Sequence, residues 1–135
     1  MSELPLRVLL YSDERAVRDQ VRLALGRKVA ADLPDIVIEE AATQAAVIRA
    51  ADAGGYSLFI LDAEAAPSGG MGIAYQLKDE IADCPPVLLL VARVADAWLA
   101  TWARAEAISP FPVDPLKLPD QVADLLRRRL ASTAA

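Results

Sequence analysis

The chain has 135 residues, no histidine, one cysteine and a formal net charge of −5 at pH 7. This length suits a single domain with one core, so we predict one domain over residues 1–135, with a disordered tail after about residue 131. The missing histidines and the lone Cys84 exclude zinc-dependent hydrolysis, His-assisted nucleophilic catalysis and an intramolecular disulfide. The negative charge opposes binding of nucleic acid through its phosphates. We therefore predict a protein that is not an enzyme and that binds no nucleic acid.

The amino terminus and the hydropathy pattern predict a cytoplasmic protein with no membrane contact. Residues 1–5 contain Glu3 and lead directly into an apolar run, so they lack the basic segment and the cleavage site of a secretory signal. No uncharged apolar run approaches the roughly 20 residues that a membrane helix requires. Both observations favour the cytoplasm.

Short apolar runs alternate along the chain with longer segments of helical period, a pattern typical of a parallel sheet covered by helices. The apolar runs predict strands at residues 6–11, 36–40, 56–61, 87–91 and 111–113. The helical segments follow them, at residues 14–25, 44–53, 73–81, 96–107 and 118–130. Gly69, Gly70 and Gly72 are assigned to the loop before the third of these helices.

Five strand and helix units of this kind predict an α/β fold of the flavodoxin-like class. Its doubly wound, five-stranded parallel sheet has the strand order 2-1-3-4-5 and helices on both faces. In this order the first and third strands are neighbours, so Asp13 and Asp62, which follow them, should converge on one crevice. Two carboxylates without a nearby histidine or cysteine suit a hard cation such as Mg²⁺. Capping of the next helix is the alternative interpretation of Asp13.

Four segments in this order resemble the receiver domains of two-component signalling. They read VLLYSDE at 8–14, LFILD at 58–62, PVLLL at 86–90 and VDP at 113–115, and together they span nearly the whole chain. The resemblance implies an acidic pair after the first strand that holds Mg²⁺ and an aspartate after the third that accepts a phosphoryl group. It also implies a threonine or serine after the fourth strand that senses this group, and a lysine before a proline after the fifth.

The resemblance is incomplete at the metal and acceptor positions. Asp62 takes the place of the phosphoacceptor, while the acidic pair is reduced to Ser12 and Asp13, with Asp13 where the family contacts the metal. The resemblance therefore implies that Asp13 and Asp62 bind Mg²⁺ weakly or not at all, and it implies no other cofactor.

The switch positions depart further from the family. Val91 falls where the hydroxyl residue belongs, Asp114 falls where the lysine belongs, and Phe111 matches the aromatic switch position. An anion in place of the cation is the most damaging change, because phosphoryl transfer depends on neutralising negative charge. Arg93 is the alternative source of a cation. By the resemblance, the bond between Asp114 and Pro115 should be the family's cis peptide.

These departures predict an atypical, stand-alone response-regulator receiver that acts as a signalling and protein-interaction module and depends little on phosphorylation. We predict that a protein partner docks on the face formed by the fourth helix, the fifth strand and the fifth helix, through Trp98, Trp102 and Phe111. The two tryptophans are four residues apart and share one side of a helix, and tryptophan is enriched at binding hot spots. Core packing of a tryptophan is the alternative to docking, and a homodimer is the alternative to a different partner.

Two other functions stay open at this point. A working phosphorelay receiver would accept a phosphoryl group on Asp62 with the help of Mg²⁺. A flavodoxin-like cofactor binder is suggested by the glycine-rich loop at residues 68–72, although this loop lacks the glycine spacing of a dinucleotide fingerprint.

Overall fold

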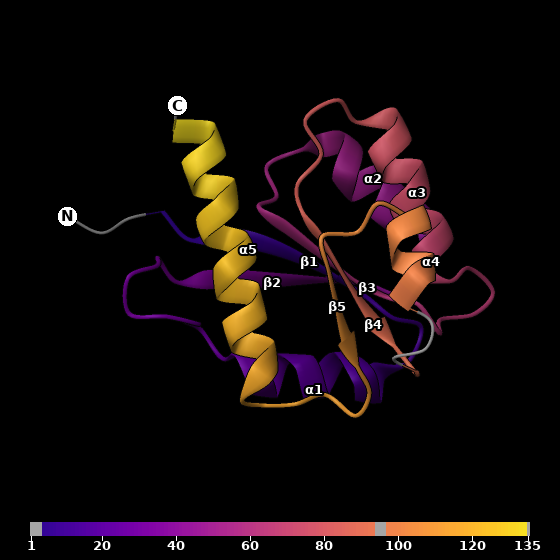
Figure 1. Ribbon diagram of the computed structural model, residues 1–135, viewed down its shortest axis with the longest axis horizontal. Helices are drawn as coiled ribbons and strands as arrows, with labels where there is room; N and C mark the ends of the chain where they lie inside the picture. Colours follow the sequence, from indigo (N-terminus) through magenta and orange to yellow (C-terminus); the bar gives the residue numbers. More distant parts are fainter. Residues whose placement is uncertain (1–3, 94–96, 135) are drawn as a thin grey trace.

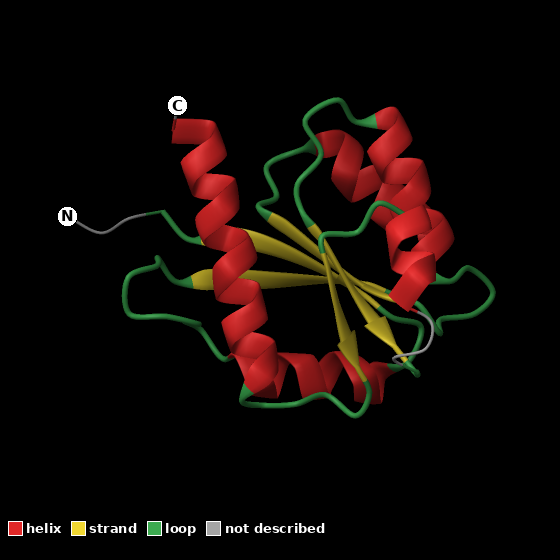
Figure 2. Cartoon of the chain, in the orientation of Figure 1, coloured by secondary structure: helices red, strands yellow, loops and turns green. Residues whose placement is uncertain are grey.

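The computed structural model describes residues 4–93 and 97–134 (Figure 1). Within these residues the chain forms a five-stranded parallel sheet with the strand order β2-β1-β3-β4-β5 and with helices on both faces (Figure 2). The predicted flavodoxin-like fold and its strand order are therefore confirmed. None of the described helices combines the length and the apolar character that a membrane span requires.

The first four strands lie where the sequence predicts them, apart from shifts of one or two residues at their ends. They are β1 (Leu6–Tyr11), β2 (Ile36–Ala41), β3 (Leu58–Asp62) and β4 (Val87–Val91). Every residue of β3 and β4 is buried, because both strands lie inside the sheet with helices on each face. This burial explains why their sequences are continuous apolar runs and do not alternate with polar residues.

The fifth strand is β5 (Ala107–Pro110), so its prediction at residues 111–113 is wrong. It pairs in parallel with β4. Alanine and proline have low strand propensity and only Ile108 favours a strand, so the local signal of this segment is weaker than that of Phe111 and Val113. Those two side chains lie in the loop after the strand and are partly buried against the core.

The helices cover both faces of the sheet. They are α1 (Arg15–Leu25), α2 (Gln44–Ala53), α3 (Gly70–Glu80), α4 (Ala97–Trp102) and α5 (Lys117–Ala134). In Figure 1, α1 and α5 lie on one side of the sheet, and α2, α3 and α4 lie on the other. Side chains alternate along each strand between the two layers. Leu9 and Tyr11 pack with α2 and α3, whereas Val8 and Leu10 pack with α1 and α5.

The helix α3 begins at Gly70, earlier than predicted, because the glycines after β3 allow a close approach. A Cβ atom at Gly70 would lie 2.9 Å from the backbone of Asp62, and one at Gly69 would lie 2.7 Å from the carbonyl oxygen of Ala63. A side chain at either position would push the amino end of α3 away from the end of β3. The glycine-rich segment therefore has a packing role beside Asp62.

The helix α4 is shorter than predicted. Its expected start at about Asp96 lies outside the described residues, and it ends at Trp102 rather than near residue 107. Arg104 adopts a positive φ of 62° just beyond it. A residue in the left-handed region ends a helix in this way.

The helix α5 is longer than predicted. It continues to Ala134, so the prediction of a disordered tail after about residue 131 is wrong. Alanine favours the helix, and the hydroxyl group of Thr133 donates to the carbonyl oxygen of Arg129 (3.0 Å) in the last turns.

Candidate functional site

The candidate site lies at the carboxyl ends of β1 and β3, which are adjacent in the sheet. Asp62 is the last residue of β3, and Ser12 directly follows β1. Only 3% of Asp62 is exposed, and Ser12 is fully buried. From β1 the chain first adds β2 on one side and then crosses over to add β3 on the other side. Open α/β sheets bind ligands at the point where the strand order switches in this way. The predicted adjacency of the two strand ends is therefore confirmed.

The carboxylate of Asp62 accepts one hydrogen bond on each oxygen. The Ser12 hydroxyl donates to Oδ2 (2.8 Å), and the backbone N–H of Glu64 donates to Oδ1 (2.8 Å). Burial raises the pKa of Asp62, the two hydrogen bonds partly offset this rise, and the charges of Asp13 and Glu64 add to it. The charged neighbours that affect this carboxylate are therefore acids.

Asp13 is exposed in the loop after β1. The N-cap of α1 is Glu14, so the alternative interpretation of Asp13 as a helix cap is wrong. The described residues contain no group of three or more His, Cys, Asp or Glu side chains that could hold a metal. Asp13 and Asp62 are the predicted ligands of Mg²⁺, but both oxygens of Asp62 already have protein donors. Ser12 therefore places a neutral hydroxyl donor where the resemblance implies a second acidic ligand.

Val91 ends β4 and is fully buried in the core beneath α2 and α3. Because its side chain has no hydroxyl, it cannot hydrogen-bond a phosphoryl group. The next residue contacts an acid that the sequence analysis missed: the backbone N–H of Ala92 donates to Oε2 of Glu64 (3.2 Å). Glu64 thereby links the loop after β3 to the loop after β4. The sequence signal for Glu64 was its position two residues after Asp62. This position alone does not predict the contact with Ala92.

The structure places Asp114 at the amino end of α5, so its assignment to the lysine position is wrong. Its carboxylate accepts hydrogen bonds from the backbone N–H groups of Lys117 (3.0 Å) and Leu116 (2.8 Å), and it thereby caps the helix. These two bonds lower the pKa of Asp114. The negative charge of Asp114 therefore acts on the amino end of α5.

Phe111 takes the place that the resemblance gives to the lysine. It directly follows β5 and precedes a proline, because the strand ends earlier than predicted. It therefore does not begin the strand, and its assignment to the aromatic switch position is corrected as well. The cis peptides of the described residues are Ala66–Pro67 and Phe111–Pro112. The prediction of a cis bond between Asp114 and Pro115 is wrong.

The three lysines of the chain lie elsewhere. Lys28 and Lys78 form ion pairs with Asp35 and Glu106, respectively, and Lys117 is exposed in the first turn of α5. Arg93, which is exposed in the loop after β4, remains a hypothesis as the substitute cation.

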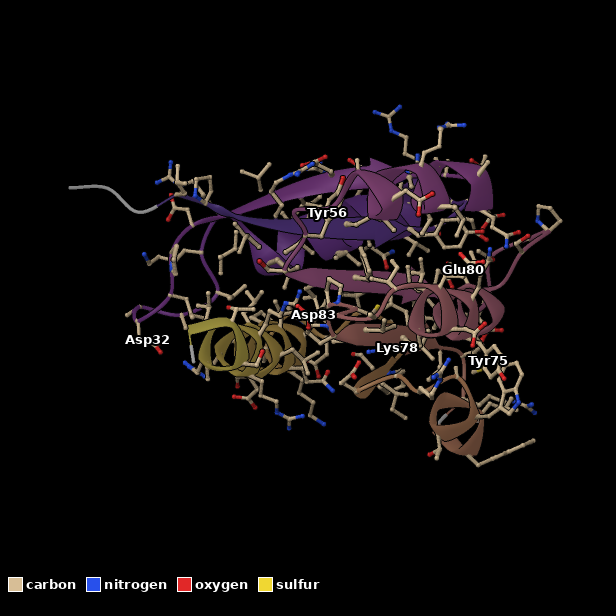
Figure 3. All side chains as sticks on the ribbon, turned by 90° about the horizontal axis from the view of Figure 1, so that it is seen from above. Asp32, Tyr56, Tyr75, Lys78, Glu80 and Asp83 are labelled. Atoms are coloured by element: carbon tan, nitrogen blue, oxygen red, sulfur yellow. The ribbon has the colours of Figure 1, made fainter. Side chains whose placement is uncertain are left out.

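The two tryptophans of the chain are exposed on α4, with 69% of Trp98 and 54% of Trp102 accessible, so core packing is the wrong interpretation. The ring of Trp102 stacks on Tyr75 of α3, with ring centroids 4.7 Å apart, and Figure 3 shows Tyr75 beside α4. Arg104 lies 5.2 Å from the centroid of the same Tyr75 ring. Phe111 packs against the core on the other side of the sheet. The exposed aromatic side chains therefore belong to α3 and α4, and the predicted grouping with Phe111 is corrected.

Two proteins of Mycobacterium tuberculosis are similar to this chain in sequence. They are response regulatory proteins of strains CDC 1551 and H37Rv, each 55% identical over 126 residues. The match covers 93% of this chain and 95% of each relative. No protein-family model matches the chain.

Solved receiver domains share the fold. The signal receiver domain of an HD domain-containing protein from Pseudomonas fluorescens Pf-5 is 13% identical, with a TM-score of 0.81 that covers 99% of this chain and 96% of that one. The response regulator TrrA of Thermotoga maritima, in complex with Mg²⁺ and BeF, is 23% identical and has a TM-score of 0.72. The match covers 89% of this chain and 98% of TrrA. These identities show the fold alone, while the similarity to the mycobacterial proteins shows the family. The chain therefore belongs to the response regulators, and its fold is that of their receiver domains.

Proposed function

We propose that this chain is an atypical receiver that acts as a signalling and protein-interaction module and depends little on phosphorylation of Asp62. The observation that carries the proposal is that Ser12 and Glu64 donate to the two oxygens of this carboxylate. Phosphoryl transfer depends on positive charge and on donors aimed at the transferred group. The last residue of β4 is Val91 and the first residue after β5 is Phe111, and neither side chain supplies a charge or a donor.

The expected loss can be estimated from the two missing contacts. A hydrogen bond to a charged group contributes about 1.5–3 kcal/mol, and a unit charge at about 5 Å contributes ~3 kcal/mol at an effective dielectric of about 20. Losing both removes roughly 5 kcal/mol from the interaction with a phosphoryl group. A ligand shifts a conformational equilibrium only by its differential affinity for the two states. Phosphorylation should therefore change the conformation of this protein little.

A protein partner is expected to dock through α4, where Trp98 and Trp102 are exposed. Tryptophan is enriched at interface hot spots, and contiguous exposed apolar surface on a monomer marks an interaction site. Tyr75, which stacks on Trp102, extends this surface onto α3. We therefore favour a docking surface at α4 and α3 over one that extends to β5 and α5. A second copy of the chain is the alternative partner.

The proposal is tested with acetyl phosphate and Mg²⁺. Both tryptophans lie in α4, so their fluorescence reports on the proposed docking helix while mass spectrometry measures phosphoryl uptake. We expect far less than one phosphoryl group per chain and no change in tryptophan emission, in the wild type and in Asp62→Asn. The triple variant Ser12→Asp with Val91→Thr and Phe111→Lys supplies the missing acidic ligand together with both missing groups, and it serves as the positive control, with higher uptake expected.

A working phosphorelay receiver is the second candidate function, and the retention of Asp62 with Asp13 close to it favours this alternative. Stoichiometric labelling of the wild type, together with an emission change that Asp62→Asn abolishes, would establish the phosphorelay function and refute phosphorylation independence.

A further inference from the structure

Hydrogen bonds fix the backbone of Ser12 through both its N–H group and its carbonyl group. Its backbone N–H donates to the carbonyl oxygen of Ala41 (3.2 Å), and its own carbonyl oxygen accepts from Nη1 of Arg18 (2.7 Å). Arg18 in turn pairs with Glu40 (2.8 Å). Because Glu40 and Ala41 belong to β2, the residue that follows β1 is fixed to the neighbouring strand.

The surroundings of the Ser12 hydroxyl also determine where its proton points. Oγ accepts a hydrogen bond from the backbone N–H of Glu14 (3.1 Å) and lies 2.8 Å from Oδ2 of Asp62. An ionised carboxylate can only accept, so the hydroxyl donates to Asp62. Oδ1 accepts from the backbone N–H of Glu64. Each oxygen of a carboxylate that is 3% exposed therefore has a neutral donor.

We propose that the Ser12 hydroxyl is a positioning group that takes the place of a metal ion at Asp62 and keeps Mg²⁺ away from this carboxylate. A buried carboxylate requires compensation from a cation or from hydrogen-bond donors, and here the donors supply it. Proteins usually bind Mg²⁺ through one or two carboxylates and several waters. At this site the ion would have to share Oδ2 with the hydroxyl proton of Ser12, which repels a cation, and it would gain no second buried carboxylate in return.

This inference rests on the proposed function, in which Asp62 needs no metal, but its test uses neither a partner nor a phosphoryl donor. The two proposals can therefore fail separately. The readout is the set of backbone amide resonances in NMR spectra of the full chain during a titration with Mg²⁺ alone. The amides of Glu14 and Glu64 are the reporters, because each hydrogen-bonds to one member of the pair formed by Ser12 and Asp62.

In the wild type, we expect the two reporter resonances to stay in place up to millimolar Mg²⁺. Ser12→Asp supplies a second buried carboxylate, so its reporter resonances should shift and saturate, with Mg²⁺ binding at least about tenfold tighter than in the wild type. Ser109→Ala is the matched control. It changes a buried serine of β5, a strand that is not adjacent to β3, and should behave like the wild type.

Ser12→Ala separates the loss of the hydroxyl from the gain of a charge, and it keeps the proposal testable if Ser12→Asp does not fold. Without Mg²⁺, its two reporter resonances should differ from those of the wild type, and with Mg²⁺ they should respond more than the wild type does. The proposal is overturned if the wild type binds Mg²⁺ as tightly as Ser12→Asp, or if folded Ser12→Asp does not respond. It is also overturned if Ser12→Ala leaves both resonances and the Mg²⁺ response unchanged.

Discussion

The carboxylates of Glu39 and Asp62 lie on the same sheet and are stabilised in different ways. Glu39 of β2 accepts two hydrogen bonds from the guanidinium group of Arg7 (2.6 and 3.0 Å) and one from the hydroxyl of Tyr56 (2.9 Å). The bond from Arg7 is the main reason why the pKa of Glu39 is lowered. Asp62 receives neutral donors, and burial raises its pKa. A cation therefore stabilises the ionised form of Glu39, whereas only hydrogen bonds from neutral donors stabilise the ionised form of Asp62.

This difference separates a structural ion pair from a site that has kept its acid but lost its counter-charge. Arg7 also lies over the ring of Tyr56, 4.4 Å from its centroid, and donates to the carbonyl oxygen of Gly54 (3.2 Å). The pair with Glu39 is about two-fifths exposed on each side, so solvent screens its contribution. Asp62 is buried, and hydrogen bonds are worth more in such surroundings. Stability should therefore depend more on the Ser12 bond than on the Arg7 pair.

The largest expected effect is that of Ser12→Ala, because it leaves a buried carboxylate short of one donor. Loss of a hydrogen bond to a charged group costs about 1.5–3 kcal/mol, so the free energy of unfolding at neutral pH should fall by about 2 kcal/mol. Urea denaturation measures this loss. The control is Thr43→Ala, which removes the hydroxyl that caps α2 by accepting from Ala46 (3.1 Å) and should cost about 1 kcal/mol. A loss at Ser12 no greater than that at Thr43 would contradict the ranking.

The strands and their order could be predicted because they depend on patterns spread over many residues. The continuous apolar runs of β3 and β4 indicate strands buried on both faces, and the topology rules then make β1 and β3 neighbours. The hydrogen bond from Ser12 to Asp62 and the contact of Glu64 with Ala92 depend on distances between loops. No local pattern encodes those distances, so the sequence predicted the location of the site without its internal contacts.

One misplaced strand explains the wrong assignments at the fifth position. The aromatic and β-branched residues at 111–113 have a higher strand propensity than those of β5, yet pairing with β4 selects residues 107–110. The lysine position then moves from Asp114 to Phe111, and the expected cis bond at Pro115 moves with it. The stacking of Trp102 on Tyr75 was also unpredictable from local sequence, because it depends on how α3 packs beside α4.

A smaller loss of stability than that of Ser12→Ala is expected for Arg7→Met, which keeps an apolar stem but removes the charge. Solvent screens the partly exposed ion pair with Glu39, so the loss includes little beyond that pair and the cation–π contact with Tyr56. Because salt screens exposed charges, the loss should shrink when urea denaturation is repeated at high ionic strength, whereas the loss in Ser12→Ala should not. If Arg7→Met destabilises the fold more than Ser12→Ala does, the exposed pair is the stronger of the two contacts.

The smallest expected effect is a pH dependence of opposite sign at the two acids. The raised pKa of Asp62 means that its contribution to the free energy of unfolding is fully present below its unfolded pKa and is lost as pH rises through the folded pKa. The lowered pKa of Glu39 means the reverse: its contribution is present above the unfolded pKa and is lost as pH falls through the folded pKa. Each effect is limited to one group, and solvent screens the one at Glu39.

The measurement is urea denaturation of the wild type, Asp62→Asn and Glu39→Gln over the acidic to neutral range. Neither amide titrates there, so the stability of the wild type relative to each variant isolates one carboxyl group. Relative to Asp62→Asn, the wild type should lose stability as pH rises, because burial penalises the charged form. Relative to Glu39→Gln, it should gain stability as pH rises, because the Arg7 guanidinium favours the charged form. Two slopes of the same sign would mean that Ser12 and Glu64 stabilise the ionised form of Asp62 by more than burial opposes it, and the contrast between the two acids would then disappear.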